Sequence, residues 1–137
     1  IIGCFDIFHC GHERLLQKVR AVSEVFSIAL NTDEDMRASK CEPHDKPDRR
    51  MQNCKQQDGV QSVEAYDYEN LRDIVLKVSV DVVVVSPEYG REREEQALFL
   101  EWLGDRGIAR LSFPRTPGVS STELRSSHSA LSSCAPT

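Results

Sequence analysis

Two histidines and two glycines lie close together near the start of the chain, in the run Gly3-Cys4-Phe5-Asp6-Ile7-Phe8-His9-Cys10-Gly11-His12. Apolar residues precede this run and a helical pattern follows it, so it is predicted to form a strand-to-helix turn. At such turns in α/β folds, backbone N–H groups and a helix N-terminus bind anions. His9 and His12 can donate hydrogen bonds to phosphate oxygens there without carrying a charge. A glycine turn with two partly exposed histidines is the alternative explanation of the same spacing.

A second run with phosphate-binding residue types lies near the far end, Pro114-Arg115-Thr116-Pro117-Gly118-Val119-Ser120-Ser121-Thr122. An arginine fork, free N–H groups after a glycine turn and hydroxyls at a helix N-terminus would together hold phosphate oxygens. Ser120 and Glu123 also fit a capping box, which needs no ligand. Taken alone, this run is better explained by the cap.

The overall charge excludes some classes of partner. The chain has 137 residues and a formal net charge of −5, whereas nucleic-acid binders are usually basic, so no nucleic-acid partner is expected. No apolar run approaches the roughly 20 residues that cross a bilayer, so no membrane span is expected. Positive charge gathers locally at Lys40, Lys46, Arg49 and Arg50, where a phosphate ligand or simply a solvated face is predicted. The chain begins without Met and within a predicted strand, so upstream residues are expected to be missing.

The cysteines favour a reducing compartment. There are five of them, at positions 4, 10, 41, 54 and 134, without a Cys-x-x-Cys pair. An odd number in a chain of this size predicts reduced thiols and a cytoplasmic protein rather than a disulfide framework. Cys4, His9, Cys10 and His12 match no familiar zinc spacing, so we expect no metal held by protein ligands.

The elements that must position these residues alternate between strand and helix. Strands are predicted at 1–3, 25–30, 60–65, 81–86 and 108–113. Helices are predicted at 11–22, 47–57, 67–78 and 92–105, with another starting at Ser120, and a loop is predicted at 36–48. In the fourth helix, the residues predicted to be mostly core are Ala97, Leu98, Leu100, Trp102 and Leu103.

This alternation predicts an α/β fold with a parallel sheet and right-handed crossovers. Four consecutive valines at 82–85 indicate a strand covered on both faces. Ligands of such sheets bind beyond the carboxyl ends of the strands, where the loops 3–12, 86–91 and 114–119 would meet. We expect one domain over residues 1–125 and a disordered, Ser-rich tail over 126–137.

The two runs together resemble the two signatures of the cytidylyltransferase-like nucleotidyltransferases. The first run, followed by Leu15-Leu16, is similar to their histidine signature, and Arg115 to Thr122 is similar to their second. Asn31-Thr32-Asp33-Glu34 and Arg50 add to the likeness, which reaches to about Arg125. The Arg-Thr before Gly is most similar to the glycerol-3-phosphate, ethanolamine-phosphate and choline-phosphate cytidylyltransferases of phospholipid biosynthesis.

The resemblance implies a Rossmann-like five-stranded parallel sheet, ordered 3-2-1-4-5, with helices on both faces. It implies that an acceptor phosphate attacks the α-phosphate of a nucleoside triphosphate, with Mg²⁺ present and pyrophosphate released. CTP would be favoured over ATP, and the protein would be a homodimer.

The resemblance also implies roles for individual residues. His9, His12, Lys40 and Arg115 would be catalytic. Nucleotide binding would fall to Gly3, Cys4, Phe5, Asp6, Gly11, His12, Arg115, Gly118, Ser120, Ser121 and Thr122. The acceptor would be bound by Asp6, Lys40, Arg50, Glu88 and Tyr89.

The run Ser86-Pro87-Glu88-Tyr89-Gly90 departs from the glycine, acidic residue and aromatic that many relatives place after the fourth strand. Three hypotheses therefore remain at this stage. The first is a cytidylyltransferase acting on a phosphorylated small alcohol. The second is an adenylyltransferase of the same superfamily, with a sugar phosphate, FMN or phosphopantetheine as acceptor. The third is a catalytically silent nucleotide-binding domain.

Overall fold

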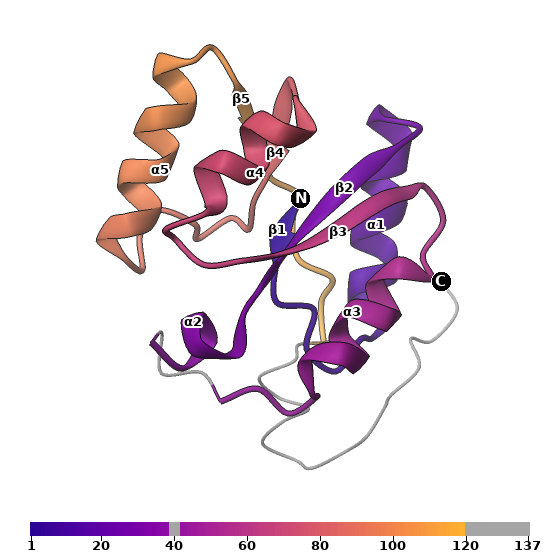
Figure 1. Ribbon diagram of the computed structural model, residues 1–137. Coiled ribbons are helices and arrows are strands. Elements are labelled where there is room, and N and C mark those ends of the chain that lie inside the picture. The colour runs from indigo at the N-terminus through magenta and orange to yellow at the C-terminus, as the bar shows by residue number, and fades with distance from the viewer. Residues whose placement is uncertain (39–41, 120–137) are drawn as a thin grey trace.

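The strands form two small parallel sheets in a computed structural model that describes residues 1–38 and 42–119. One sheet has the order β1-β2-β3, with β1 at Ile2–Gly3, β2 at Phe26–Asn31 and β3 at Val60–Tyr66. The other pairs β4 (Val82–Val84) with β5 (Ala109–Leu111). Figure 1 shows the pair β4 and β5 beside the longer strands β2 and β3. All three strand pairings are parallel, as predicted.

The predicted single sheet of five strands is wrong, because β1 and β4 are not paired in the described part of the chain. β1 is only two residues long and pairs Ile2 with Ala29 and Gly3 with Leu30. The backbone then turns at Phe5, whose φ is +45°, so it cannot extend a strand. Residues of β1 and of β4 instead line one cavity. The short first strand therefore leaves two sheets with a hollow between them.

Within residues 1–38 and 42–119, five helices connect the strands: α1 (Cys10–Val22), α2 (Asp33–Ala38), α3 (Pro47–Lys55), α4 (Leu71–Val78) and α5 (Glu94–Asp105). All but α2 were predicted from the sequence. The short helix α2 occupies part of the predicted loop 36–48, because Thr32 Oγ1 accepts a hydrogen bond from the Asp35 N–H at 3.1 Å and starts the helix. The predicted helix at Ser120 and the predicted tail 126–137 lie outside the described residues.

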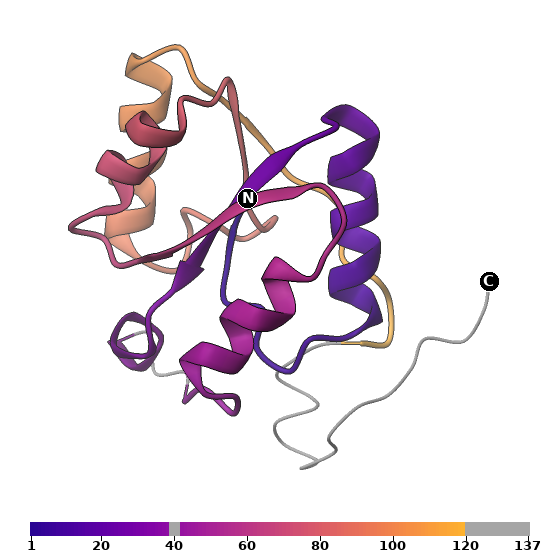
Figure 2. The ribbon, with the colours of Figure 1, turned by 45° about the vertical axis from the view of Figure 1, so that its right-hand side comes forward.

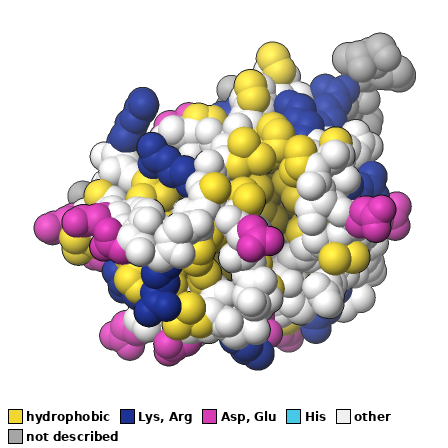
Figure 3. Space-filling view, turned by 90° about the horizontal axis from the view of Figure 1, so that it is seen from above, with side chains coloured by type: hydrophobic (Ala, Val, Ile, Leu, Met, Phe, Trp, Pro, Cys, Tyr) yellow, Lys and Arg dark blue, Asp and Glu magenta, His cyan; other side chains and the backbone are white. Residues whose placement is uncertain are grey.

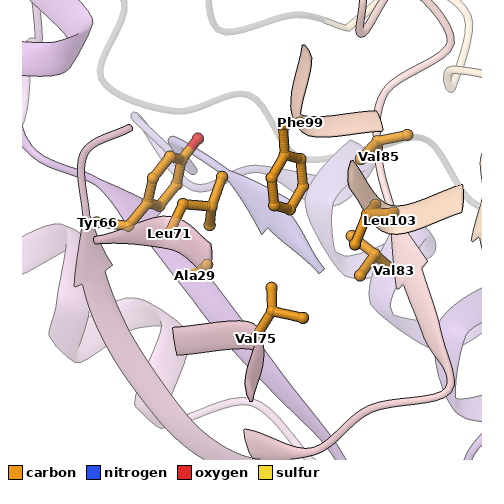
Figure 4. Close-up of a cluster of buried hydrophobic side chains, with 8 residues drawn as sticks. All are labelled: Ala29, Tyr66, Leu71, Val75, Val83, Val85, Phe99 and Leu103. Carbon is orange, nitrogen blue, oxygen red and sulfur yellow. The ribbon is translucent and has the colours of Figure 1, made fainter. Parts of the chain in front are cut away.

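Helices cover the two faces of the first sheet, as predicted, and β2 shows this most clearly. Ile28 and Leu30 of β2 belong to a core cluster with Leu16 of α1 and Cys54 of α3. Ala29 points to the opposite face, where the second cluster gathers side chains from β3, α4, β4 and α5. Figure 4 shows that cluster, and Figure 2 shows α1 and α3 on one side of the strands with α4 and α5 on the other.

The buried stripe of α5 differs from the predicted one. Leu103 is buried as expected, but the other buried positions are Gln96 and Phe99, while Leu98 is 49% exposed. The spacing 96, 99 and 103 follows one helical face, which positions 97 and 98 do not share. The valine run is likewise buried from Val83 onward only.

The face seen from above in Figure 3 carries gathered hydrophobic side chains, with charged ones around them, and no coloured residue on it is a histidine. Within the described residues, none of the helices is both long and apolar enough to cross a membrane.

Candidate active site

A cavity of about 420 Å³ brings together all three loops that were predicted to meet, a volume within the usual range of small-ligand sites. Its lining includes His9 from the loop before α1, His12 from the first turn of α1, Tyr89 from the loop after β4, and Arg115 from the loop after β5. The predicted binding residues Gly3, Cys4, Phe5 and Gly11 also line it. Asp6, Arg50, Glu88 and Gly118 are not part of the lining.

His9 and His12 form a capping box at the start of α1. His9 Nδ1 accepts a hydrogen bond from the Gly11 N–H at 3.0 Å, and His12 Nδ1 accepts one from the His9 N–H at 3.2 Å. The two rings stack with centroids 3.8 Å apart. Because both Nδ1 atoms accept hydrogen bonds, the proton of each neutral ring is on Nε2. Each histidine can therefore offer one N–H donor to a ligand in the cavity.

Both histidines are neutral at physiological pH. Burial, with a smaller effect of His9 and Arg115, lowers the pKa of His12 to about 3. Burial also lowers the pKa of His9. Protonation would place a hydrogen on an Nδ1 that already accepts one, so the geometry and the pKa shifts agree.

Gly11 gives space to the ring of His9. A Cβ at position 11 would lie 2.8 Å from His9 Cε1, closer than carbon atoms normally approach. Gly3 does the same for Phe5, whose Cε2 would lie 2.9 Å from a Cβ at position 3. These glycines therefore allow the side chains around the capping box to pack.

The loop between β1 and α1 has a strained backbone. Phe5 and Ile7 have φ values of +45° and +47°, which are unusual for residues with a side chain and most of all for a β-branched one. The buried Asp6 carboxylate accepts hydrogen bonds from the N–H groups of His44 and Asp45 at 2.9 and 2.8 Å. Asp6 thus holds this loop against the segment before α3.

Arg115 is held by Glu88 across the two loops. Its Nε and Nη2 donate to the two Glu88 carboxylate oxygens at 3.2 and 2.6 Å. The hydrogen bonds from Arg115 lower the pKa of Glu88, and Glu88 raises the pKa of Arg115. Glu88, which the resemblance places at the acceptor, thus contacts Arg115. Gly118 has φ +79°, as the predicted glycine turn requires.

Arg50 joins three segments and is 1% exposed. Its guanidinium donates to the Cys4 carbonyl, to the Asn31 carbonyl and, at 2.6 Å, to Asp33 Oδ1. The structure thus places Arg50 beneath the loop before α1 rather than in the cavity wall, where an acceptor would be reached.

Sequence reasoning missed several polar side chains in the lining. Asn31, Tyr66, Tyr68, Arg93 and Gln96 line the cavity near Tyr89. Tyr66 and Tyr68 stand at and just after the end of β3, where a parallel sheet binds its ligands. That position is the signal that could have found the tyrosines.

Four predicted residues, Lys40, Ser120, Ser121 and Thr122, lie outside the described part of the chain. Among the described cysteines, Cys4 and Cys54 are free thiols, whereas Cys10 is disulfide-bonded. The prediction of reduced thiols is therefore wrong at Cys10. No group of three or more His, Cys, Asp or Glu within the described residues is arranged to hold a metal ion.

Comparison with known proteins gives the family. The family model described as cytidylyltransferase-like matches residues 1–127. The bifunctional protein HldE of Wolinella succinogenes is 32% identical over 115 residues, which cover 78% of this chain and 24% of that protein. The HldE protein of Desulfatibacillum aliphaticivorans is 27% identical over 124 residues, covering 89% of this chain and 25% of that protein. The chain thus spans about a quarter of the length of these curated relatives.

A solved structure supports the fold. The crystal structure of the lipopolysaccharide core biosynthesis protein from Thermoplasma volcanium superposes with a TM-score of 0.69 at 18% identity. The match covers 84% of this chain and 93% of that one. The Rossmann-like arrangement of parallel strands and helices is therefore shared, although the sheet is divided here.

Proposed function

This chain belongs to the cytidylyltransferase-like family, and from that premise we propose that its cavity transfers a nucleotidyl group from a nucleoside triphosphate to a phosphorylated acceptor. An acceptor phosphate oxygen attacks the α-phosphorus, the bond from this phosphorus to the bridging oxygen breaks, and pyrophosphate leaves with that electron pair. The observation that carries the proposal is that one cavity is lined by both neutral histidines of the capping box and by Arg115. Such transfers depend on positioning and charge stabilisation rather than on a covalent intermediate.

The histidines supply hydrogen bonds to the charge that develops on the bridging oxygen. Their Nδ1 atoms are bound to backbone N–H groups, so each ring is fixed with its Nε2–H as the donor. A donor that needs no rearrangement at the moment of reaction is the kind that accelerates a transfer most. The strained loop before α1 helps to fix this geometry.

Arg115 binds the β- and γ-phosphates in this proposal. Its bidentate pair with Glu88 holds the guanidinium at the cavity before the triphosphate enters, and the triphosphate then shares or replaces that partner. Lys40, Ser120, Ser121 and Thr122 are proposed to complete the phosphate contacts.

Mg²⁺ fits this site as a companion of the triphosphate. Mg²⁺ is usually held by phosphate oxygens and water with one or two carboxylates, so no cage of protein ligands is required. Glu92 is the only carboxylate among the described lining residues, and it is the residue proposed to contact the ion or its water. The ion supplies neutralisation of the phosphate charges.

The relatives favour a different substrate pair from the one that the second signature suggested. The proteins named above are bifunctional HldE proteins, not glycerol-phosphate, ethanolamine-phosphate or choline-phosphate cytidylyltransferases. They favour the alternative reading, an adenylyltransferase with a sugar phosphate as acceptor. We therefore propose transfer of AMP from ATP to a sugar phosphate.

Pyrophosphate release by the full chain with Mg²⁺ tests this proposal. ATP and CTP are each offered with a hexose 1-phosphate, glycerol 3-phosphate and ethanolamine phosphate. The proposal expects turnover of ATP with the sugar phosphate and little turnover of CTP. Turnover of CTP with the small alcohol phosphates would return the function to the cytidylyltransferase reading. Absence of turnover with bound nucleotide would favour a silent domain.

A further inference from the structure

A second group of polar side chains lines the same cavity away from the capping box. The lining residues in this group come from β2, β3 and the region around the start of α5: Asn31, Tyr66, Tyr68, Tyr89, Arg93 and Gln96. The triphosphate contacts proposed above use none of them. They therefore need an explanation of their own.

Part of this group forms a continuous chain of hydrogen bonds. The Tyr66 hydroxyl donates to Asn31 Oδ1 at 2.8 Å, and Asn31 Nδ2 donates to Asp35 Oδ2 at 2.6 Å. Arg93 Nη1 donates to the other oxygen of Asp35 at 3.4 Å. Arg93 Nε also pairs with Glu95 Oε2 at 3.4 Å. Together these contacts fix the position of the Arg93 guanidinium in the cavity wall.

Arg93 in turn lies over the ring of Tyr68, with its guanidinium carbon 4.7 Å from the ring centroid. The Tyr68 and Tyr89 hydroxyl oxygens are 3.3 Å apart, and either one can be the donor. Gln96 contacts the Tyr68 hydroxyl as well and accepts from the Gly90 N–H at 3.0 Å. Burial raises the pKa of both tyrosines, so their hydroxyls keep their protons.

On the proposed function, we infer that Tyr68, Tyr89, Gln96 and Arg93 form the subsite for the hydroxyl-rich body of the sugar phosphate. Hydroxyl groups of a ligand donate and accept at once, and the tyrosine hydroxyls and the Gln96 amide do the same. The guanidinium adds donors that are fixed in one plane. Asp35 is a positioning residue that acts through Arg93.

A nucleobase fits this subsite less well than a sugar. Bases are commonly held by stacking on an aromatic face, and one face of Tyr68 is already covered by Arg93. The Tyr68 ring also meets Tyr66 edge to face, with centroids 6.1 Å apart. The side chains that line the cavity beside Tyr68 are the polar ones of Tyr89, Arg93 and Gln96, which suit a ligand with many hydroxyls.

The test compares two acceptors in wild type, Tyr68→Phe and Arg93→Met. A hexose 1-phosphate carries several hydroxyls and glycerol 3-phosphate few, and both are assayed with ATP and Mg²⁺ by pyrophosphate release. Each variant is expected to lose roughly 10- to 100-fold in kcat/KM for the hexose phosphate, with a smaller loss for glycerol 3-phosphate and an unchanged KM for ATP. Equal losses for both acceptors, or a change confined to the KM for ATP, would overturn the inference.

Arg91→Met is the matched control, because Arg91 is an exposed arginine on the same loop that lines no part of this cavity. It should leave both acceptors unaffected. Thermal melting of each variant checks the fold, and Tyr68→Phe keeps the ring on which Arg93 rests. A Tyr68→Phe protein with a wild-type preference for the hexose phosphate contradicts the subsite.

Direct binding separates this inference from the proposed function. Titration calorimetry of the full chain measures the affinity for a hexose 1-phosphate and for inorganic phosphate without any nucleotide. Wild type should prefer the hexose phosphate, and both variants should lose that preference, even if no acceptor is turned over and the proposed function fails. Equal affinity of wild type for the two probes would refute the subsite by itself.

Discussion

Replacing His12 by asparagine separates two roles of the ring, the proposed hydrogen bond from Nε2–H in catalysis and the hydrogen bond that caps α1. His12 Nδ1 accepts the His9 N–H at 3.2 Å, and an asparagine Oδ1 can accept the same hydrogen bond. The substitution removes the Nε2–H donor from the cavity. One preorganised donor of this kind is worth about 10²–10³ in kcat, so we expect His12→Asn to lose that factor while its melting temperature stays near that of wild type.

His12→Ala is the matched comparison, because it removes the donor and the cap together. A lost cap costs about 1 kcal/mol, which corresponds to a fall of roughly 3–6 °C in the melting temperature of a domain of this size. Steady-state pyrophosphate release and thermal melting of the three proteins measure both effects. If His12→Asn keeps the wild-type kcat, the Nε2–H donor of His12 has no part in the reaction.

Three further outcomes follow from the structure. Burial lowers the pKa of His12 from 6.5 to about 3, so as the pH falls the unfolded chain binds a proton at this histidine before the folded protein does. The free energy of unfolding should therefore drop by roughly 2 kcal/mol between pH 6.5 and 5. Urea titrations in which His12→Asn loses as much unfolding free energy as wild type over this range would contradict this. Arg50→Met should lower the free energy of unfolding by about 3–5 kcal/mol, because it leaves the Asp33 carboxylate without its guanidinium partner. It should leave the KM for the phosphorylated acceptor unchanged in the folded protein. A raised KM with unchanged stability would instead place Arg50 at the acceptor. Gly11→Ala should displace the His9 ring, because the new Cβ would lie 2.8 Å from it, and should reduce kcat roughly 10²-fold. Gly104→Ala is the control, because no atom lies within 4 Å of a Cβ at that position. It should keep the wild-type kcat.

The alternation of elements could be predicted because the apolar periodicities are local. The pattern of β2, with Ile28 and Leu30 on one face and Ala29 on the other, is set by a period of two. The prediction of a single five-stranded sheet failed because it depended on the lengths of the strands and on contacts between distant elements. The sheet divides where β1 is two residues long, and strand pairing between distant segments is not encoded in either segment alone.

The candidate site was predictable as a set of residue types but not as an arrangement. His9 and His12 were expected to bind phosphate. Their capping box at the start of α1 could not be predicted, because it depends on the positions of the two rings in the folded protein. Arg50 has the positive charge expected of a residue that binds the substrate phosphate, yet its guanidinium is buried and donates hydrogen bonds to three protein oxygens. The burial of a long side chain leaves no local pattern in the sequence. Arg93 is one of many surface-type arginines in the sequence, and only tertiary packing brings it over Tyr68.

The position of the transferred phosphorus distinguishes nucleotidyl transfer from phosphoryl transfer and from hydrolysis of ATP. ATP labelled in its α-phosphate or in its γ-phosphate is incubated with the full chain, Mg²⁺ and a hexose 1-phosphate, and the labelled products are separated. If the cavity transfers a nucleotidyl group, the α-label appears in a nucleotide-linked sugar and the γ-label appears in pyrophosphate. Transfer of the γ-label to the acceptor, or release of labelled inorganic phosphate without a nucleotide-linked product, would contradict it.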